Sequence, residues 1–184
     1  MAWIGISGAH GVGKSSVISD IENILQERIT VVREVAREVI AKGFPLGKEA
    51  DTDSYVCLVA EYIKARSTVR NKTRPIVVFD RTILDTLSYA MVNLTRGVAV
   101  KHHVIELLEA VWKEEKNSFS EYIFIPIEFE ETKRSGTELD ESYRAQISDK
   151  IMANLYLSDV NFSELRGGRE ERVSQLASIL SKYL

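Results

Sequence analysis

The sequence predicts an α/β domain in which helices cover both faces of a largely parallel sheet. Short apolar runs that suit strands alternate with helical patterns along the whole chain. The run at residues 76–79 is apolar without alternation, as expected for a strand that is covered on both faces. The first strand leads through a glycine-rich turn directly into a helical pattern, which makes a strand–loop–helix unit.

The same patterns place each element in order. Strands are expected at residues 2–7, 29–34, 76–80, 121–127 and 160–165. Helices are expected at residues 16–27, 54–71, 82–96, 100–116 and 169–184. No internal repeat and no linker rich in Pro, Gly or Ser divides the chain. A length of 184 residues suits one domain, so we expect a single domain over residues 1–184.

Composition and charge narrow the classes of function. The net charge is −3, from 24 Lys and Arg against 27 Asp and Glu, which argues against nucleic acid or an anionic membrane as partner. No apolar run approaches the ~18 residues of a membrane span, and we expect no secretory leader. Cys57 is the single cysteine, so the chain cannot form an internal disulfide. A reducing, cytoplasmic location is therefore expected.

Residues 8–15 match the P-loop pattern G-x-x-x-x-G-K-[ST] at every fixed position. Glycines let the backbone of such a loop turn where a Cβ would clash. Successive N–H groups then wrap a phosphate at the positive end of the following helix dipole. Lys14 can reach the β- and γ-phosphates, and the Ser15 hydroxyl can bind Mg²⁺. The expected nucleotide contacts are Gly8, His10, Gly11, Val12, Gly13, Lys14, Ser15 and Ser16.

Charged residues also end other expected strands, where ligands of parallel sheets bind. Asp80 stands where P-loop proteins hold the carboxylate that orients Mg²⁺, although it could instead cap the helix that starts at Thr82. Arg81 is expected to pair with phosphate or, alternatively, with a carboxylate. Glu34 ends the second strand and is a candidate general base, and a solvated surface carboxylate is an equal alternative.

A polar stretch that is basic at its start follows the fourth strand. It is typical of a mobile lid, which we place at about residues 128–145 and which could bring a cation onto a transferring phosphoryl group. Arg134 is the first candidate, ahead of Lys133 and of Arg144 on the following helix. A solvated loop without a catalytic role is the alternative.

Gly167 and Gly168 follow the fifth strand, where a glycine pair could let the backbone border an adenine or could form a plain turn. His102 and His103 have no Cys or further His or Asp at the spacing of metal ligands, so no zinc site is expected. A nucleophile elbow and a guanine-binding [NT]-K-x-D motif are absent from the sequence, which argues against a serine hydrolase and a GTPase.

Together these stretches resemble the group of small P-loop kinases and ATPases that contains the ribosylnicotinamide kinase domain. The Glu-Val-Ala-Arg stretch at 34–37 looks like the E-P-V-A-R segment of deoxynucleoside kinases, with Val35 in place of the proline. Phe-Asp-Arg-Thr at 79–82 is similar to their [DE]-R-S motif and to the D-R motif of thymidylate kinases. A late Gly-x-x-Glu-Glu-Arg that ends at Arg172 also recurs in the group. The likeness runs from Ile4 to about Val173.

The resemblance implies a three-layer P-loop kinase fold with strand order 2-3-1-4-5, and ATP and Mg²⁺ as cofactors. It implies Glu34 as the acceptor-side base, Arg81 as a clamp on acceptor and phosphoryl oxygens, and Arg134 as a lid cation. We therefore expect an ATP-dependent kinase that acts on a small nucleoside-like or nucleotide-like acceptor. The expected catalytic residues are Lys14, Glu34, Asp80, Arg81 and Arg134, with Ser15 and Asp80 on the metal and Gly168 near the adenine.

Other functions remain open. A nucleoside monophosphate kinase would need cations for the acceptor phosphate, and Arg37 and Arg81 could serve. A regulatory ATPase or nucleotide-sensing module would instead act on a protein partner. A polynucleotide kinase is disfavoured by the acidic balance. The long helices could also pair two copies into a homodimer.

Overall fold

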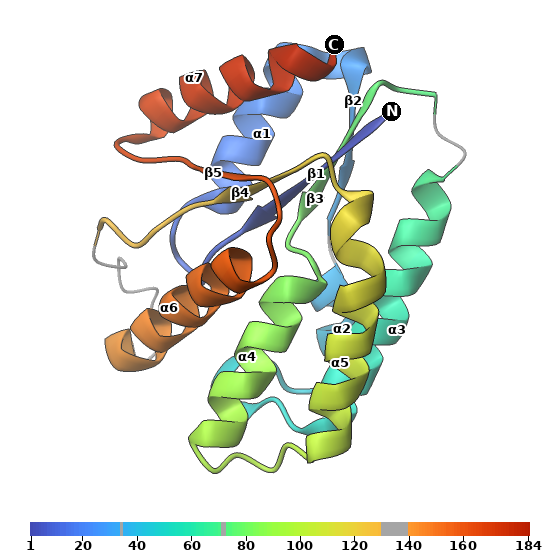
Figure 1. The fold of residues 1–184 in the computed structure, drawn as a ribbon, viewed down its shortest axis with the longest axis vertical. Coiled ribbons are helices and arrows are strands. Elements are labelled where there is room, and N and C mark those ends of the chain that lie inside the picture. Colours follow the sequence, from blue (N-terminus) through green and yellow to red (C-terminus); the bar gives the residue numbers. More distant parts are fainter. Residues whose placement is uncertain (34, 71–72, 130–139) are drawn as a thin grey trace.

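The described residues form one parallel sheet of five strands. The computed structural model describes residues 1–33, 35–70, 73–129 and 140–184. The strands are β1 (Ala2–Ser7), β2 (Ile29–Val32), β3 (Ile76–Asp80), β4 (Glu121–Phe124) and β5 (Phe162–Glu164). They lie in the order β2-β3-β1-β4-β5, with β1 at the centre (Figure 1). The predicted α/β fold with strand order 2-3-1-4-5 is confirmed.

The register of the strands explains why β4 is shorter than predicted. It ends at Phe124 rather than at residue 127. The last pair between β4 and β1 joins Phe124 to Ser7, where β1 ends. Beyond Ser7 the chain leaves the sheet for the glycine-rich loop, so β4 has no strand to pair with on that side. Strand β5 stops at the same level, because Glu164 pairs with Phe124.

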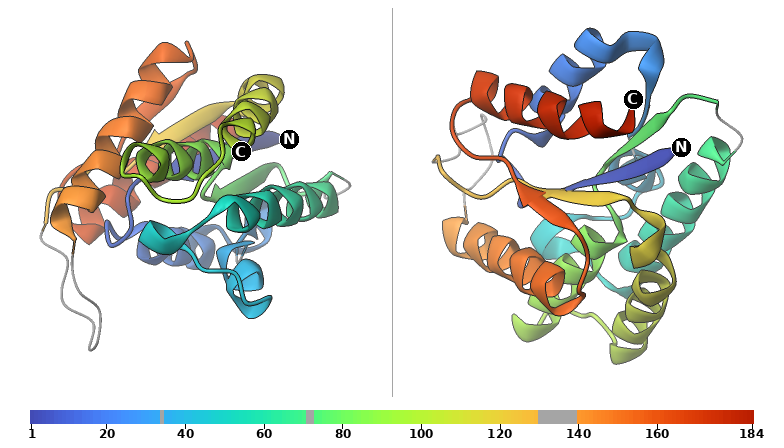
Figure 2. Two further views of the ribbon diagram at one scale, coloured as in Figure 1. Left: turned by 90° about the horizontal axis from the view of Figure 1, so that it is seen from below. Right: turned by 45° about the horizontal axis from the view of Figure 1, so that its top comes forward.

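Helices cover both faces of the sheet and complete three layers. The described α-helices are α1 (Lys14–Leu25), α2 (Val35–Ala41), α3 (Thr52–Val69), α4 (Ile83–Thr95), α5 (His102–Glu115), α6 (Glu141–Leu157) and α7 (Arg169–Leu180). Helices α1 and α7 lie on one face, and α3, α4, α5 and α6 lie on the other (Figures 1 and 2). The connection through α1 runs across the sheet in the opposite direction to the later ones, so right-handed crossovers place it on the opposite face.

Two helices depart from the sequence prediction. Helix α2 was not predicted, because its seven residues are too few for a helical period to show. Helix α6 was expected only as the helix that carries Arg144. Its buried apolar residues recur at every fourth position and make a stripe only one residue wide. They are Tyr143, Ile147, Ile151 and Leu155.

The strands beneath the glycine-rich loop are fully packed. Ile4, Ile6 and Phe79 have 0% of their surface exposed. Burial of each such side chain contributes about 1.5–3 kcal/mol, which makes β1 and β3 a firm base for the loops at their carboxyl ends. None of the described helices has the length and apolar character to cross a membrane.

Candidate active site

The P-loop connects the end of β1 to the first turn of α1. Its glycines take backbone angles that other residues resist, with φ of 72° at Gly11 and 89° at Gly13. A Cβ on Gly8 would lie 2.6 Å from the carbonyl oxygen of Ile125, so the loop passes too close to the chain after β4 for any side chain there. Gly11, Gly13, Ser15 and Ser16 are exposed, which leaves this end of α1 open to a ligand.

Lys14 is buried under the loop and held by the loop's own backbone. Its Nζ donates hydrogen bonds to the carbonyl oxygens of Gly8 at 2.7 Å and Ala9 at 2.5 Å. Burial, reinforced by the nearby Arg81 guanidinium, lowers the pKa of Lys14 to about 7, although Asp85 and Asp80 oppose the shift. A phosphate bound in the loop would place further negative charge beside Lys14 and would favour the charged form of its amine.

Ser15 and Asp80 lie together although they are far apart in sequence. The Ser15 Oγ donates to the Asp80 Oδ2 at 2.9 Å. Asp80 ends β3, whose pairing with Ile6 of β1 brings it to the base of the P-loop. The alternative role of Asp80 as a helix cap is wrong, because α4 is capped by Thr82. A hydroxyl and a carboxylate oxygen side by side are ligands that suit Mg²⁺.

Asp85 is a site residue that the sequence prediction missed. It is 1% exposed and joins three elements. Its Oδ2 accepts hydrogen bonds from the Ser7 Oγ at 2.7 Å and the Thr82 N–H at 3.0 Å, and its Oδ1 accepts from the Gly8 N–H at 3.2 Å. The capping-box pattern Thr82-x-x-Asp85 was a signal in the sequence for the helix contact, but the contact with Gly8 depends on the fold.

Arg81 follows β3 in a strained conformation, with φ of 79°. Its backbone N–H donates to the carbonyl oxygen of Ile6 at 3.0 Å, which holds that conformation. Its Nη1 lies 3.3 Å from the Asp85 Oδ1 and 3.4 Å from the Gly8 carbonyl oxygen. Arg81 therefore pairs with a carboxylate, the alternative given above, while it remains next to the P-loop. Strain of this kind is often kept at functional sites.

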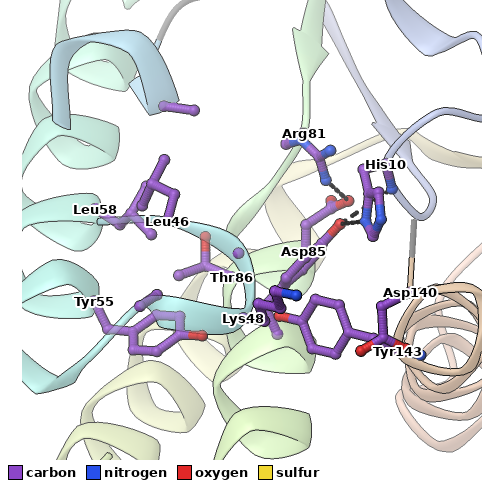
Figure 3. Close-up of a pocket in the computed structure, with 14 residues that line it drawn as sticks. His10, Leu46, Lys48, Tyr55, Leu58, Arg81, Asp85, Thr86, Asp140 and Tyr143 are labelled. Atoms are coloured by element: carbon purple, nitrogen blue, oxygen red, sulfur yellow. Dashed lines mark hydrogen bonds and ion pairs between the residues drawn. The ribbon is translucent and has the colours of Figure 1, made fainter. Parts of the chain in front are cut away.

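A cavity of about 300 Å³ opens beside the P-loop. Arg81, Asp85 and His10 lie at one end, and Leu46 and Leu58 lie across from them (Figure 3). Its lining residues come from the P-loop, from the segments around α2, α3 and α4, and from the start of α6. They are His10, Ala36, Leu46, Gly47, Lys48, Ala50, Tyr55, Leu58, Arg81, Asp85, Thr86, Tyr89, Asp140 and Tyr143.

Tyr89 connects this cavity to the P-loop. Its hydroxyl oxygen accepts a hydrogen bond from the His10 N–H at 3.1 Å and lies 3.0 Å from the His10 Nδ1. Burial raises the pKa of Tyr89, so the hydroxyl keeps its proton. The Arg81 guanidinium lies over the Tyr89 ring, 5.5 Å from its centroid. A ligand in the cavity would thus touch residues that also shape the phosphate loop.

The remaining predicted residues divide into two groups. Glu34 and the lid candidates Lys133 and Arg134 lie outside the described residues. Gly168 is the N-cap of α7, and its N–H donates to the Glu171 Oε2 at 2.7 Å. Helix α7 then brings Arg172 to the P-loop, where its Nη1 donates to the Val12 carbonyl oxygen at 2.7 Å.

The chain matches a known protein family in sequence and several solved structures in fold. A family model described as an AAA domain matches residues 3–172. No curated protein sequence matches the chain. Among solved structures, deoxyadenosine kinase from M. mycoides matches with a TM-score of 0.71 and 15% sequence identity, over 98% of this chain and 99% of that one.

Two further structures are similar. The NadR protein in complex with NR has a TM-score of 0.76 and 16% identity, over 99% of this chain but 51% of that one, so this chain spans about half of NadR. Thymidylate kinase from Candida albicans has a TM-score of 0.69 and 14% identity, over 98% of this chain and 91% of that one. These likenesses and the family match confirm the resemblance drawn from the sequence and show the P-loop kinase fold.

Proposed function

This chain belongs to the AAA domain family, and from that premise we propose that it is an ATP-dependent phosphotransferase. It would move the γ-phosphate of ATP to a hydroxyl or phosphate of a small nucleoside-like or nucleotide-like acceptor. The nucleoside and nucleotide kinases with the same fold support this class of reaction.

One observation supports the proposal most directly: a P-loop residue, and a second residue hydrogen-bonded to the P-loop, also line the cavity. His10 belongs to the P-loop and lines the cavity, and Asp85 both lines the cavity and accepts a hydrogen bond from the Gly8 N–H. Transfer requires the attacking oxygen to be held within about 3–3.5 Å of the phosphorus, so donor and acceptor must bind side by side. A cavity next to a phosphate loop meets that requirement.

The residues of the chain would divide the work as follows. The P-loop N–H groups and Lys14 would hold the triphosphate, and Ser15 and Asp80 would hold Mg²⁺. The metal neutralises charge on the phosphate oxygens when it is bound. Arg81 would contact the transferring phosphoryl group from the cavity side. The roles of Glu34 as base and Arg134 as lid cation belong to the same proposal and rest on the sequence resemblance.

The aromatic and aliphatic lining of the cavity supports a small acceptor over a protein partner. Tyr55, Leu46 and Leu58 offer apolar surface to a flat ring, and pockets for small molecules are mostly apolar with a few polar groups. A nucleoside monophosphate remains within the proposal, because Arg81 and Lys48 lie at the cavity. A cytoplasmic location and pairing into a homodimer remain predictions.

Labelled-ATP transfer to a panel of nucleosides, mononucleotides and ribosylnicotinamide tests the proposal. The wild type should label at least one acceptor, and Lys14→Ala should label none. Leu46→Trp, which fills the cavity, should keep ATP binding and lower transfer by about 10²-fold or more, because misplacement of one substrate costs that much. Slow ATP hydrolysis without transfer to any acceptor would favour the regulatory ATPase. Normal transfer by the Leu46→Trp variant would exclude this cavity as the acceptor site.

A further inference from the structure

Two buried arginines from distant helices hold the P-loop backbone. Arg144 of α6 donates from its Nε to the carbonyl oxygen of His10 at 3.1 Å. Arg172 of α7 donates from its Nη1 to the carbonyl oxygen of Val12 at 2.7 Å. Arg144 is 2% exposed and Arg172 is 5% exposed. Charged side chains are rarely buried to this degree unless their contacts compensate for lost hydration.

Further donors of both guanidinium groups are also engaged, whereas the buried Nε of Arg172 has no hydrogen-bond partner among the described residues. The Nη1 and Nη2 of Arg144 each donate to the carbonyl oxygen of Phe129 at 3.1 Å. The Nη2 of Arg172 donates to the Glu128 Oε2 at 2.8 Å, and its guanidinium lies over the Phe129 ring. These contacts fix both guanidinium groups between the P-loop and the chain after β4. Arg144 also pairs through its Nη1 with the Glu141 Oε2 at 3.0 Å, so both arginines bind backbone carbonyl groups and carboxylates of the protein itself.

The two carbonyl groups that they hold both precede a glycine. In a trans peptide the C=O of one residue and the N–H of the next point in opposite directions. Holding the His10 carbonyl towards Arg144 therefore turns the N–H of Gly11 away from α6. Holding the Val12 carbonyl towards Arg172 turns the N–H of Gly13 away from α7. These are N–H groups that a P-loop presents to phosphate.

Peptides that precede a glycine need such support. A glycine adopts positive and negative φ with similar ease, so the plane before it can rotate at little cost. Gly11 and Gly13 both have positive φ, at 72° and 89°. Rotation of either peptide would replace a donor N–H with a carbonyl oxygen on the phosphate side, which repels an anion.

We propose that Arg144 and Arg172 are positioning residues that hold the Gly11 and Gly13 N–H groups in the orientation that binds phosphate. The inference rests on the proposed binding of a triphosphate by the P-loop. It gives a role to Arg172, the arginine of the late Gly-x-x-Glu-Glu-Arg motif, which has no other role in the proposed reaction. The two arginines act through the backbone and make no contact with the nucleotide base.

The experiment compares Mg-ATP with inorganic tripolyphosphate and Mg²⁺ as ligands, measured by titration calorimetry. The variants are Arg144→Gln, Arg172→Gln and Arg172→Lys. The matched control is Arg169→Gln in the same first turn of α7, because Arg169 pairs with Asp20 at 2.6 Å and has a 63% exposed side chain. Thermal melts show that each variant is folded at the temperature of the titration.

Each glutamine variant should bind both ligands about tenfold more weakly, because one hydrogen bond to a charged group is worth about that factor or more. Arg172→Lys should recover part of the loss, since an ammonium can still donate to the Val12 carbonyl. Arg169→Gln should bind as the wild type does. If a glutamine variant does not fold, Arg172→Lys carries the test, with weaker binding of both ligands than in the wild type expected.

Three results would overturn the inference. Unchanged affinity for both ligands in folded variants would show that the arginines only support the fold. Loss of ATP affinity with unchanged tripolyphosphate affinity would place them at the nucleoside. An equal loss in Arg169→Gln would show a general effect of charge. If the wild type binds neither ligand, the proposed function itself fails, which is a separate outcome.

Discussion

At the scale of single residues, Lys14 shows how the P-loop is prepared for an anion. The Lys14 ammonium is buried among carbonyl oxygens, and burial together with Arg81 lowers its pKa to about 7. A bound triphosphate supplies several negative charges and should return the pKa towards its ordinary value. Lys14 is then partly neutral before binding and charged afterwards, so binding should take up a proton.

This predicts a buffer-dependent heat of nucleotide binding. At pH 8 the free protein holds Lys14 mostly neutral, so Mg-ATP binding should take up close to one proton, about 0.9 for a pKa near 7. At pH 6 the residue is already charged and uptake should be about 0.1. Titration calorimetry in two buffers with different ionisation enthalpies measures the uptake. Equal heats in both buffers at pH 8 would contradict the shift of the Lys14 pKa.

The residues that could be predicted from the sequence are those whose role follows from a local motif. Lys14 and Ser15 follow from the P-loop pattern, and Asp80 follows from its place at the end of an apolar strand. Tyr89 and Arg172 were not predicted, because each meets the P-loop across a large separation in sequence. A tyrosine at helical spacing and an arginine in a charged segment look the same whether they face solvent or a loop that folding brings near.

At the scale of elements, α3 and α5 share a buried acid that ties them together. Glu115 near the end of α5 is 0% exposed and accepts hydrogen bonds from the Tyr62 hydroxyl and from the Arg66 Nη1. Burial raises the pKa of Glu115 to about 7, although Tyr62 and Arg66 oppose the rise. The folded protein therefore keeps a proton that the unfolded chain loses near pH 4.5.

The free energy of unfolding should therefore decrease over one range of rising pH. Between about pH 4.5 and pH 7 the folded state binds more protons than the unfolded state, so the free energy of unfolding decreases as pH rises and levels off above pH 7. Titration of Glu115 contributes at most about 3 kcal/mol to this decrease in the free energy of unfolding. Glu115→Gln keeps an acceptor for Tyr62 and cannot titrate, so its free energy of unfolding should lack this decrease.

Urea unfolding of both proteins from pH 5 to pH 8 measures the difference. The gap between the variant and the wild type should widen in favour of the variant as pH rises. If the free energies of unfolding of the two proteins change in parallel over this pH range, Glu115 is ionised throughout and its pKa is not raised. This contact could not be predicted from the sequence, because Glu115 lies among other charged residues and its burial depends on how α3 packs on α5.

At the scale of the whole molecule, the fold class was predictable because strand and helix patterns alternate and the apolar run at residues 76–79 shows burial on both faces. The strand order came from the resemblance, since periodicity alone does not say which strands are neighbours. The shape of the cavity could not be predicted, because it depends on side chains that folding brings together from separate segments of the chain.

Nucleotide binding should stabilise the whole domain. A ligand that binds only the folded state at a hundred times its Kd contributes about 2.7 kcal/mol. For a chain of 184 residues this corresponds to a rise in melting temperature of roughly 5–10 °C. A thermal melt with and without Mg-ATP measures the shift, and Lys14→Ala should show little of it. A shift of the same size in that variant would place the nucleotide outside the P-loop.

The support of the P-loop by Arg172 has a consequence for the chain during synthesis. The phosphate-binding motif is complete at Ser15, whereas the arginine that holds Val12 belongs to α7 and follows Val12 by 160 residues. A growing chain on the ribosome thus carries the motif long before it carries the contact that orients it. ATP should therefore stabilise the finished protein and give no such help to its unfinished precursors.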